Sequence, residues 1–115
     1  MELTVLEMDG EIVVTAAAHE MDAYCTFRKI EANWDYDEFI VIDQWFVTRE
    51  LRGRGIGREL FRAAVREAKT RYPSLPIHIV IPPLDRYTNY NRLVKFFSNE
   101  NFLVSATDTV ASLIG

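Results

Sequence analysis

The segment LRGRGIGREL, residues 51–60, joins a strand-like pattern to a helix-like pattern through three glycines and three arginines. The arginines are Arg52, Arg54 and Arg58, and all three lie where the helix pattern begins. The positive end of the helix dipole lies at that point, so each cation there costs about 0.3–1 kcal/mol. Three such cations indicate that the segment faces an anion from outside the chain.

The segments on either side of the glycines form a strand–helix–strand unit. Glu38–Thr48, EFIVIDQWFVT, is a long run of β-branched and aromatic residues, which is typical of a central strand. Gly57–Arg71 has an apolar stripe at helical spacing, and the prolines of RYPSLP end it. Ile77–Ile81, IHIVI, predicts a short strand covered on both faces. The two strands of such a unit are expected to be parallel neighbours.

The rest of the chain adds mainly antiparallel elements. ELTVLEMDGEIVVTA predicts two strands around an Asp9–Gly10 hairpin turn, and AYCTFRKI predicts a third strand. Asn91–Asn99 is expected to form a short helix, and NFLVSATDTVASLIG one or two final strands. We therefore predict an α/β protein with a mixed sheet and helices on its faces, forming a single domain over residues 1–115.

The composition is that of a soluble globular domain, with 49% hydrophobic and 26% charged residues. The only cysteine, Cys25, lies in the apolar run AYCTF, so we expect it to be buried and the compartment to be reducing. Without an apolar run of about 18 residues or a signal-like N-terminus, the chain is expected to be cytoplasmic, with no membrane partner. His19 and His78 lack the spacing of metal ligands, so no metal is expected.

The net charge of −4 conceals a segregation of charge along the chain. Residues 49–71 contain eight Lys/Arg and three Asp/Glu, a balance of +5, whereas residues 1–48 contain two Lys/Arg and eleven Asp/Glu, a balance of −9. The basic segment is suited to an anionic ligand and the acidic one to a cationic partner. Because the overall charge is negative, a nucleic-acid partner is disfavoured.

The start of the predicted helix lacks the residues that usually cap a helix. No Ser, Thr, Asp or Asn lies between Glu50 and Thr70, so the first N–H groups of the helix need another acceptor. A phosphate or pyrophosphate would supply it, and Gly53, Gly55 and Gly57 would let the backbone approach closely. The Lys-Ser/Thr pair of a P-loop is missing, and the glycine spacing differs from the dinucleotide-binding fingerprint. The pattern therefore favours a different phosphate-bearing ligand.

The stretch VTRELRGRGIGREL resembles motif A of the GCN5-related N-acetyltransferase (GNAT) superfamily, in a short form. Arg52, Gly55 and Gly57 meet the pattern Q/R-x-x-G-x-G/A, and the similarity extends over roughly residues 38–102. The resemblance implies acetyl-CoA as cosubstrate and no metal. It also implies a mostly antiparallel mixed sheet whose parallel β-α-β unit is splayed at the acetyl-CoA site. The chain is short for this superfamily, which predicts reduced N-terminal helices.

The resemblance further implies which residues bind acetyl-CoA. The glycine loop and its arginines would hold the pyrophosphate, and the end of the preceding strand would pair with the pantetheine arm. An amide near Val47 would polarise the thioester carbonyl. The implied cofactor-binding residues are Trp45, Phe46, Val47, Arg52, Gly53, Arg54, Gly55, Ile56, Gly57 and Arg58.

Two residues are candidates for moving protons. Asp43 interrupts an apolar strand and, at strand spacing, shares a face with Trp45 and Val47, so it is our candidate base for activating an amine. The alternative is that Asp43 is a hydrogen-bonded structural acid. Phe97 occupies the position where the resemblance implies a proton-donating Tyr, and Tyr90 is the candidate to replace that donor.

The resemblance implies transfer of an acetyl group to a primary amine by direct attack. Reduced N-terminal helices predict an open, acidic acceptor site, which suits a lysine or amino terminus of a protein. The alternative is a catalytically silent acyl-CoA-binding sensor or scaffold, which the Phe97 substitution favours. A nucleic-acid binder ranks last, and a homodimer is compatible with each of these functions.

Overall fold

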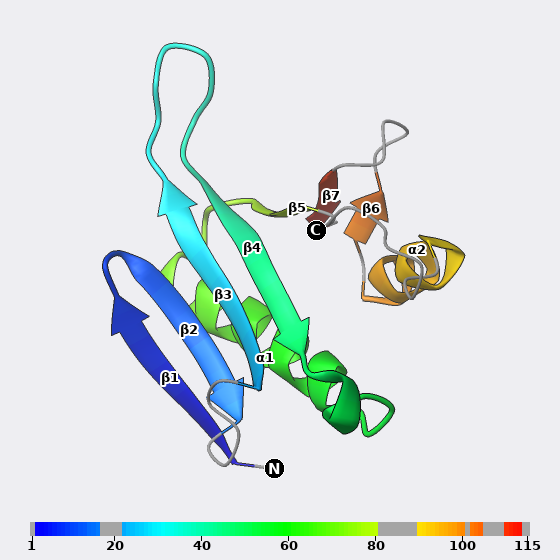
Figure 1. Cartoon of the computed structure of the whole chain (residues 1–115). Coiled ribbons are helices and arrows are strands. Elements are labelled where there is room, and N and C mark those ends of the chain that lie inside the picture. The colour runs from blue at the N-terminus through cyan, green and yellow to red at the C-terminus, as the bar shows by residue number, and fades with distance from the viewer. Residues whose placement is uncertain (1, 17–21, 81–89, 101, 105–109, 114–115) are drawn as a thin grey trace.

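The computed structural model describes residues 2–16, 22–80, 90–100, 102–104 and 110–113. Within these residues the chain forms one seven-stranded sheet and two α-helices (Figure 1). The elements in chain order are β1 (Leu3–Met8), β2 (Glu11–Ala16), β3 (Ala23–Ile30), β4 (Phe39–Val47), the 3-10 turn η1 (Arg49–Leu51), α1 (Ile56–Arg71), β5 (Ile77–Val80), α2 (Tyr90–Asn99), β6 (Phe102–Val104) and β7 (Val110–Leu113).

The sheet is mixed and mostly antiparallel, as predicted. Its strand order is β1-β2-β3-β4-β5-β7-β6, and β4 and β5 are the parallel pair among the described strands. Helix α1 makes the crossover between them, because a parallel pair cannot be joined by a tight turn. The strand–helix–strand unit expected around the glycines is therefore present. Of the one or two predicted terminal strands two form, with β7 paired to β5 and β6 paired to β7.

The N-terminal strands are joined by a two-residue turn. Asp9 has φ of 49° and Gly10 has φ of 82°, the conformation that suits a tight hairpin between twisted strands. The register pairs Met8 with Glu11 directly across this turn, so no helix lies between β1 and β2. This agrees with the prediction of reduced N-terminal helices. Residues 17–21, where a reduced turn was also considered, lie outside the described residues.

Helix α1 buries its apolar stripe against one face of the sheet. It begins at Ile56, one residue earlier than predicted, because Gly55 takes a left-handed conformation and ends the loop. Cys25 is buried beneath the helix, and burial raises the pKa of its thiol. The residues of α1 that pack into the core are Leu60, Phe61, Ala63, Ala64 and Ala68.

The other face of the N-terminal strands is left without a helix in the described part of the chain. In Figure 1, α1 lies behind β2, β3 and β4, and α2 lies beside the C-terminal strands. The side of β1–β4 that is turned toward the viewer is therefore open. Met8 and Phe46 are exposed large apolar residues of these strands.

Candidate functional site

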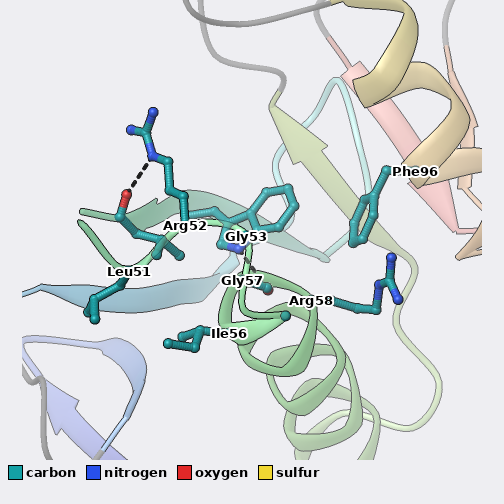
Figure 2. A pocket seen from close by; sticks show the side chains of 10 residues that line it. Leu51, Arg52, Gly53, Ile56, Gly57, Arg58 and Phe96 are labelled. Atoms are coloured by element: carbon teal, nitrogen blue, oxygen red, sulfur yellow. Dashed lines mark hydrogen bonds between the residues drawn. The ribbon is translucent and has the colours of Figure 1, made fainter. Parts of the chain in front are cut away.

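A pocket of about 480 Å³ lies where β4 ends and α1 begins. Figure 2 shows the glycine loop curling over the start of α1, with Phe96 of α2 on the opposite wall. The lining residues are Trp45, Val47, Leu51, Arg52, Gly53, Gly55, Ile56, Gly57, Arg58 and Phe96. The structure thus brings together most of the residues predicted from the glycine segment.

The loop leaves the first amides of α1 without a side-chain cap. Gly55 is the N-cap, with φ of 80°, and no side chain bonds to the helix start. The amide of Glu59 donates to the carbonyl of Gly55 at 3.2 Å, so the preceding N–H groups have no acceptor within the helix. Gly55, Ile56 and Gly57 line the pocket, and these amides make its floor an anion-binding surface.

Gly57 has a packing role that the sequence pattern did not indicate. A Cβ at this position would lie 3.3 Å from Cγ2 of Val47 and 3.5 Å from the Trp45 ring. The Trp45 Nε1 donates to the carbonyl of Gly57 at 2.9 Å, which fixes the end of β4 against the first turn of α1. Gly57 therefore lets strand and helix approach closely, whereas Gly53 and Gly55 supply the left-handed backbone of the loop.

Two of the three arginines in the glycine segment reach the pocket. The Arg52 Nε donates to the carbonyl of Val47 at 3.0 Å, and Arg58 extends from the first turn of α1 on the side of Phe96 (Figure 2). Arg54 is exposed, as Arg52 and Arg58 are, but it is not among the residues that line the pocket, so its predicted contact with the pyrophosphate stays a prediction.

The end of β4 presents main-chain groups to the pocket. The Thr48 amide donates to the carbonyl of Asp22 at 2.7 Å, so Val47 and Ala23 form a non-hydrogen-bonded pair of the ladder. The N–H and C=O of Val47 therefore point away from β3. By the alternation of the ladder, the same is true of Trp45.

Phe46 differs from its neighbours Trp45 and Val47 in the direction of its main chain, and its predicted place in the cofactor site stays a prediction. Its main chain pairs with Tyr24 of β3, and its half-exposed ring lies 5.6 Å from the Tyr24 ring. It does not line the pocket. A residue between two cleft-facing residues of a strand necessarily turns its main chain and its side chain the other way.

The strands β4 and β5 separate beside this pocket. Their ladder covers Ile40–Ile42 of β4 and Ile77–Ile79 of β5, whereas β4 continues to Val47. Within the described residues, the last part of β4 thus lacks a partner strand on the β5 side. This free edge is the splay that the resemblance implied, and it leaves main-chain donors and acceptors for an extended ligand.

A β-bulge places Asp43 on the open face of the sheet. Thr26 pairs with Gln44 while Phe27 pairs with Ile42, which leaves Asp43 as an extra residue in β4. Its carboxylate accepts a hydrogen bond from Thr26 Oγ1 at 2.7 Å and lies 3.2 Å from Arg28 Nε. Both partners project from the face of β3 opposite the buried Cys25 and Phe27, which pack toward α1.

The expectation that Asp43 shares a face with Trp45 and Val47 was therefore wrong. Trp45 contacts Phe61 and Gly57 of α1, on the face opposite Asp43. The bulge reverses the alternation of β4, so Ile42 and Trp45 both face the helix although three positions separate them. Asp43 lies next to the last β4–β5 pair, where the two strands begin to separate.

Glu11 completes a charged cluster with Asp43 on the open face. It pairs with Arg28 across β2 and β3, and its carboxyl lies within hydrogen-bonding reach of Asp43. Partial burial, together with the neighbouring Asp43, raises the pKa of Glu11 above its ordinary value of 4.5, although Arg28 opposes the shift. The cluster supplies carboxylates beside the point where β4 and β5 part.

We expect Glu11→Gln to change the pH dependence of stability in a defined direction. The stability that protonated Glu11 provides is complete below its unfolded pKa and is lost as the pH rises through its raised folded pKa. The substituted glutamine stays uncharged, so the stability of the variant relative to the wild type should increase as the pH rises above the ordinary Glu11 value of 4.5 and through its raised folded pKa. Urea denaturation at a series of pH values measures this. A difference in unfolding free energy that does not vary with pH would contradict it.

An aromatic cluster closes one side of the pocket and was not predicted as part of it. Trp45 lies 5.2 Å from Phe61 and 5.1 Å from Phe96, between ring centroids, and Phe97 is buried beside them. Leu51 and Phe96 are thus pocket residues that the sequence reasoning missed. The apolar spacing of the second helix indicated burial but not which cavity its residues would border. Tyr90 is the first residue of α2, and its side chain lies outside the described residues.

Two further features of the described residues bear on function. No helix among them is both long and apolar enough to cross a membrane. Within the same residues, no group of three or more His, Cys, Asp or Glu side chains is placed to hold a metal ion.

Comparison with known proteins shows the family. The family described as Acetyltransferase (GNAT) matches residues 2–81. The chain therefore belongs to the GNAT acetyltransferase family. A curated relative from Bacillus subtilis (strain 168), named "Putative acetyltransferase YjbC", is 29% identical over 69 residues, which are 59% of this chain and 33% of that protein. The chain thus matches about a third of the length of this relative.

Solved structures share the fold at low sequence identity. The anti-CRISPR protein AcrVA5 has a TM-score of 0.59 at 20% identity, over 99% of this chain and 100% of that one. AtaTR bound with acetyl-CoA has a TM-score of 0.61 at 14% identity, over 90% of this chain and 65% of that one. The PaiA N-acetyltransferase of Thermoplasma acidophilum in complex with coenzyme A has a TM-score of 0.60 at 14% identity, over 91% of this chain and 60% of that one.

Proposed function

We propose that this protein transfers an acetyl group from acetyl-CoA to a primary amine of a protein, a lysine or an amino terminus, by direct attack. The observation that carries the proposal is the uncapped start of α1 beside the free edge of β4. Gly53 and Gly55 hold the loop in left-handed conformations that expose amides to a pocket of about 480 Å³. Neighbours with this fold were solved with acetyl-CoA or coenzyme A, which supports the choice of ligand.

The pocket offers separate positions for the parts of the cofactor. The amides at the start of α1, with Arg58 and Arg52, would hold the pyrophosphate by charge-assisted hydrogen bonds. The outward-facing main chain of Trp45 and Val47 would pair with the pantetheine amides as an additional strand would. A pantetheine arm that runs along β4 from Val47 would lead toward Asp43. Asp43 lies next to Ile42, where the pairing between β4 and β5 ends.

Asp43 is our candidate for accepting the proton of the amine. A lysine has a pKa near 10.4, so at neutral pH the attacking nitrogen must lose a proton before it has a lone pair to donate. The carboxylate lies on the open face and is held in place by Thr26 and Arg28. The neutral nitrogen then forms a bond to the thioester carbon, the carbon–sulfur bond breaks, and CoA leaves as the thiolate. The nitrogen gives up its second proton as the amide forms, and the thiolate takes up one proton.

The open face supports a protein as the source of the amine. No helix of the described residues covers β1–β4 on the side of Asp43, so a bulky acceptor can approach. The carboxylates of Glu11 and Asp43 would attract an ammonium group. A small metabolite would be held poorly on such an open surface, because most of its area would remain in water.

The residue at position 97 favours a second candidate function, an acyl-CoA sensor or scaffold. Phe97 is fully buried in the aromatic cluster, and it stands where the resemblance implied a proton-donating Tyr. A chain that binds acetyl-CoA without turning it over would act as an acyl-CoA sensor or scaffold. Tyr90 remains the predicted donor to the departing thiolate.

One pair of measurements separates these functions. We expect isothermal titration calorimetry to detect binding of acetyl-CoA, and mass spectrometry of a lysate incubated with protein and labelled acetyl-CoA to reveal acetylated lysines or amino termini. Binding without labelled acceptors would support the sensor. Absence of binding would refute both functions. Lysate incubated with labelled acetyl-CoA alone corrects for non-enzymatic acetylation.

A further inference from the structure

The loop that joins β3 to β4 places a tryptophan in water. Residues 31–38 form a hairpin that projects from the body of the molecule at the end of these strands (Figure 1). The Trp34 side chain is 93% exposed, far more than any other large apolar residue described. An isolated tryptophan contributes little to the fold in this position, and large exposed aromatic residues are enriched at binding surfaces.

The tip of the hairpin is held in one shape although its tryptophan is not packed. The Asn33 side-chain oxygen accepts hydrogen bonds from the amides of Asp35 at 2.7 Å and Tyr36 at 3.1 Å. The Asn33 amide donates to the carbonyl of Tyr36 at 2.9 Å. The Tyr36 ring then packs against Phe39 at 5.4 Å. A partner that contacts Trp34 therefore has little loop entropy to overcome.

The acidic residues at the base of the hairpin are paired with a lysine, whereas those at its tip are not. Lys29 Nζ lies 3.3 Å from Glu31 and 3.1 Å from Glu38, and these contacts raise the pKa of Lys29, with the Glu38 hydrogen bond as the main cause. Residues 31–38 contain four acidic residues and no basic residue. The two at the tip, Asp35 and Asp37, take part in none of the ion pairs among the described residues. Trp34 is therefore flanked by negative charge.

We propose that the hairpin tip formed by Trp34, Asp35 and Asp37 is a docking site for a positively charged segment of a protein partner. A guanidinium or ammonium group would lie over the Trp34 ring, and Asp35 and Asp37 would pair with neighbouring cations. This partner would be the acetyl acceptor, an identification that rests on the proposed function. The docking site itself does not depend on the proposed function.

The charge of the tip selects this occupant over the alternatives. A second copy of the chain would bring one acidic N-terminal half against another, because residues 1–48 have a balance of −9. A membrane with anionic lipids would repel Asp35 and Asp37. A basic protein segment can place one cation over the Trp34 ring and pair other cations with Asp35 and Asp37.

The position of the hairpin is compatible with simultaneous docking and transfer. The hairpin lies at the start of β4, and the glycine loop follows its end, about 30 Å away along a nine-residue strand. Asp43 lies between them on the open face. A partner held at Trp34 would leave the pocket free for acetyl-CoA and could extend a chain across the open face.

Calorimetric titration with an unstructured Lys/Arg-rich peptide tests the proposal. We expect the wild type to bind it at physiological salt, and Trp34→Ala to weaken binding by about tenfold, the size of a well-formed cation–π contact. Asp35→Asn/Asp37→Asn should weaken it similarly. Met8→Ala, which removes an exposed apolar residue of β1, and Glu2→Gln/Asp22→Asn, which removes two exposed carboxylates at the opposite end of the sheet, should have little effect. All variants should keep the wild-type melting temperature and acetyl-CoA affinity.

The outcomes are distinct. Equal peptide affinity for the wild type and Trp34→Ala overturns the proposal, as does absence of peptide binding by the wild type. Trp34-dependent self-association, or Trp34-dependent binding to phosphatidylserine vesicles without peptide binding, also overturns it. If the peptide binds through Trp34 but acetyl-CoA does not bind, the docking site stands and the proposed function fails. If acetyl-CoA binds and acceptors are labelled equally by wild type and Trp34→Ala, the docked segment is not the acceptor.

Discussion

Replacement of Gly55 by valine is expected to lower the affinity for acetyl-CoA by at least about 100-fold. Gly55 has φ of 80° and caps α1, and a β-branched residue in that conformation costs roughly 1–2 kcal/mol or more. A Cβ at Gly55 would meet no atom within 4 Å, so the effect comes from the backbone and not from a steric clash. The loop would relieve the strain by turning the amides of Ile56 and Gly57 away from the pocket. Calorimetry with acetyl-CoA measures the loss.

The chain contains a matched control for this variant. Gly10 has φ of 82°, and a Cβ there would also meet no atom within 4 Å, but it lies in the turn between β1 and β2. Gly10→Val should show a comparable loss of stability and unchanged acetyl-CoA affinity. If Gly55→Val binds acetyl-CoA as well as Gly10→Val does, the start of α1 is not the pyrophosphate site.

Replacement of Asp43 by asparagine is expected to lower turnover by about 10²- to 10⁴-fold, the contribution of a positioned general base. Asparagine keeps an oxygen to accept the Thr26 hydrogen bond, but it cannot take the proton of the attacking amine. Asp43 lies on the face opposite the lining of the pocket, so acetyl-CoA affinity should stay unchanged. The rate of CoA thiol release with an acceptor identified in the lysate experiment measures turnover. The loss should be smaller at high pH, where more of the amine is already neutral.

Asp9→Asn serves as the control for Asp43→Asn. Asp9 is an exposed carboxylate in the turn between β1 and β2, with φ of 49°, a conformation that asparagine also adopts readily. The two variants lose the same charge, so any general effect of net charge on association should be shared. Equal turnover in both would assign Asp43 a structural role with Thr26 and Arg28 and leave the base to be found elsewhere.

The parts of the fold that were predictable are those that depend on local pattern. The Asp9–Gly10 turn was predictable because its residues tolerate positive φ, and β3 matches the predicted run AYCTFRKI residue for residue. The parallel β4–α1–β5 unit followed from two apolar strand patterns and one helical stripe between them. The uncapped start of α1 could be anticipated because no capping residue lies between Glu50 and Thr70.

The arrangement of the candidate site depended on contacts between distant segments. The bulge at Asp43 arises from the register between β3 and β4, and it moves Asp43 and Trp45 to opposite faces although strict alternation would place them together. The main chain of Phe46 pairs with β3 and not with the pocket for a similar reason, the alternation of the ladder.

Amino-acid types and their spacing were sufficient to establish the elements, their order and the need for an anion at residues 51–60, because turn, capping and periodicity preferences act within a few residues of the chain. The direction of side chains could not be predicted from residue types and spacing, because one extra residue in a strand reverses it. Phe96 likewise borders the pocket only because α2 packs against Trp45, which lies 51 positions earlier in the sequence. Strand register and helix packing are set by the whole core at once, so these assignments required the folded chain.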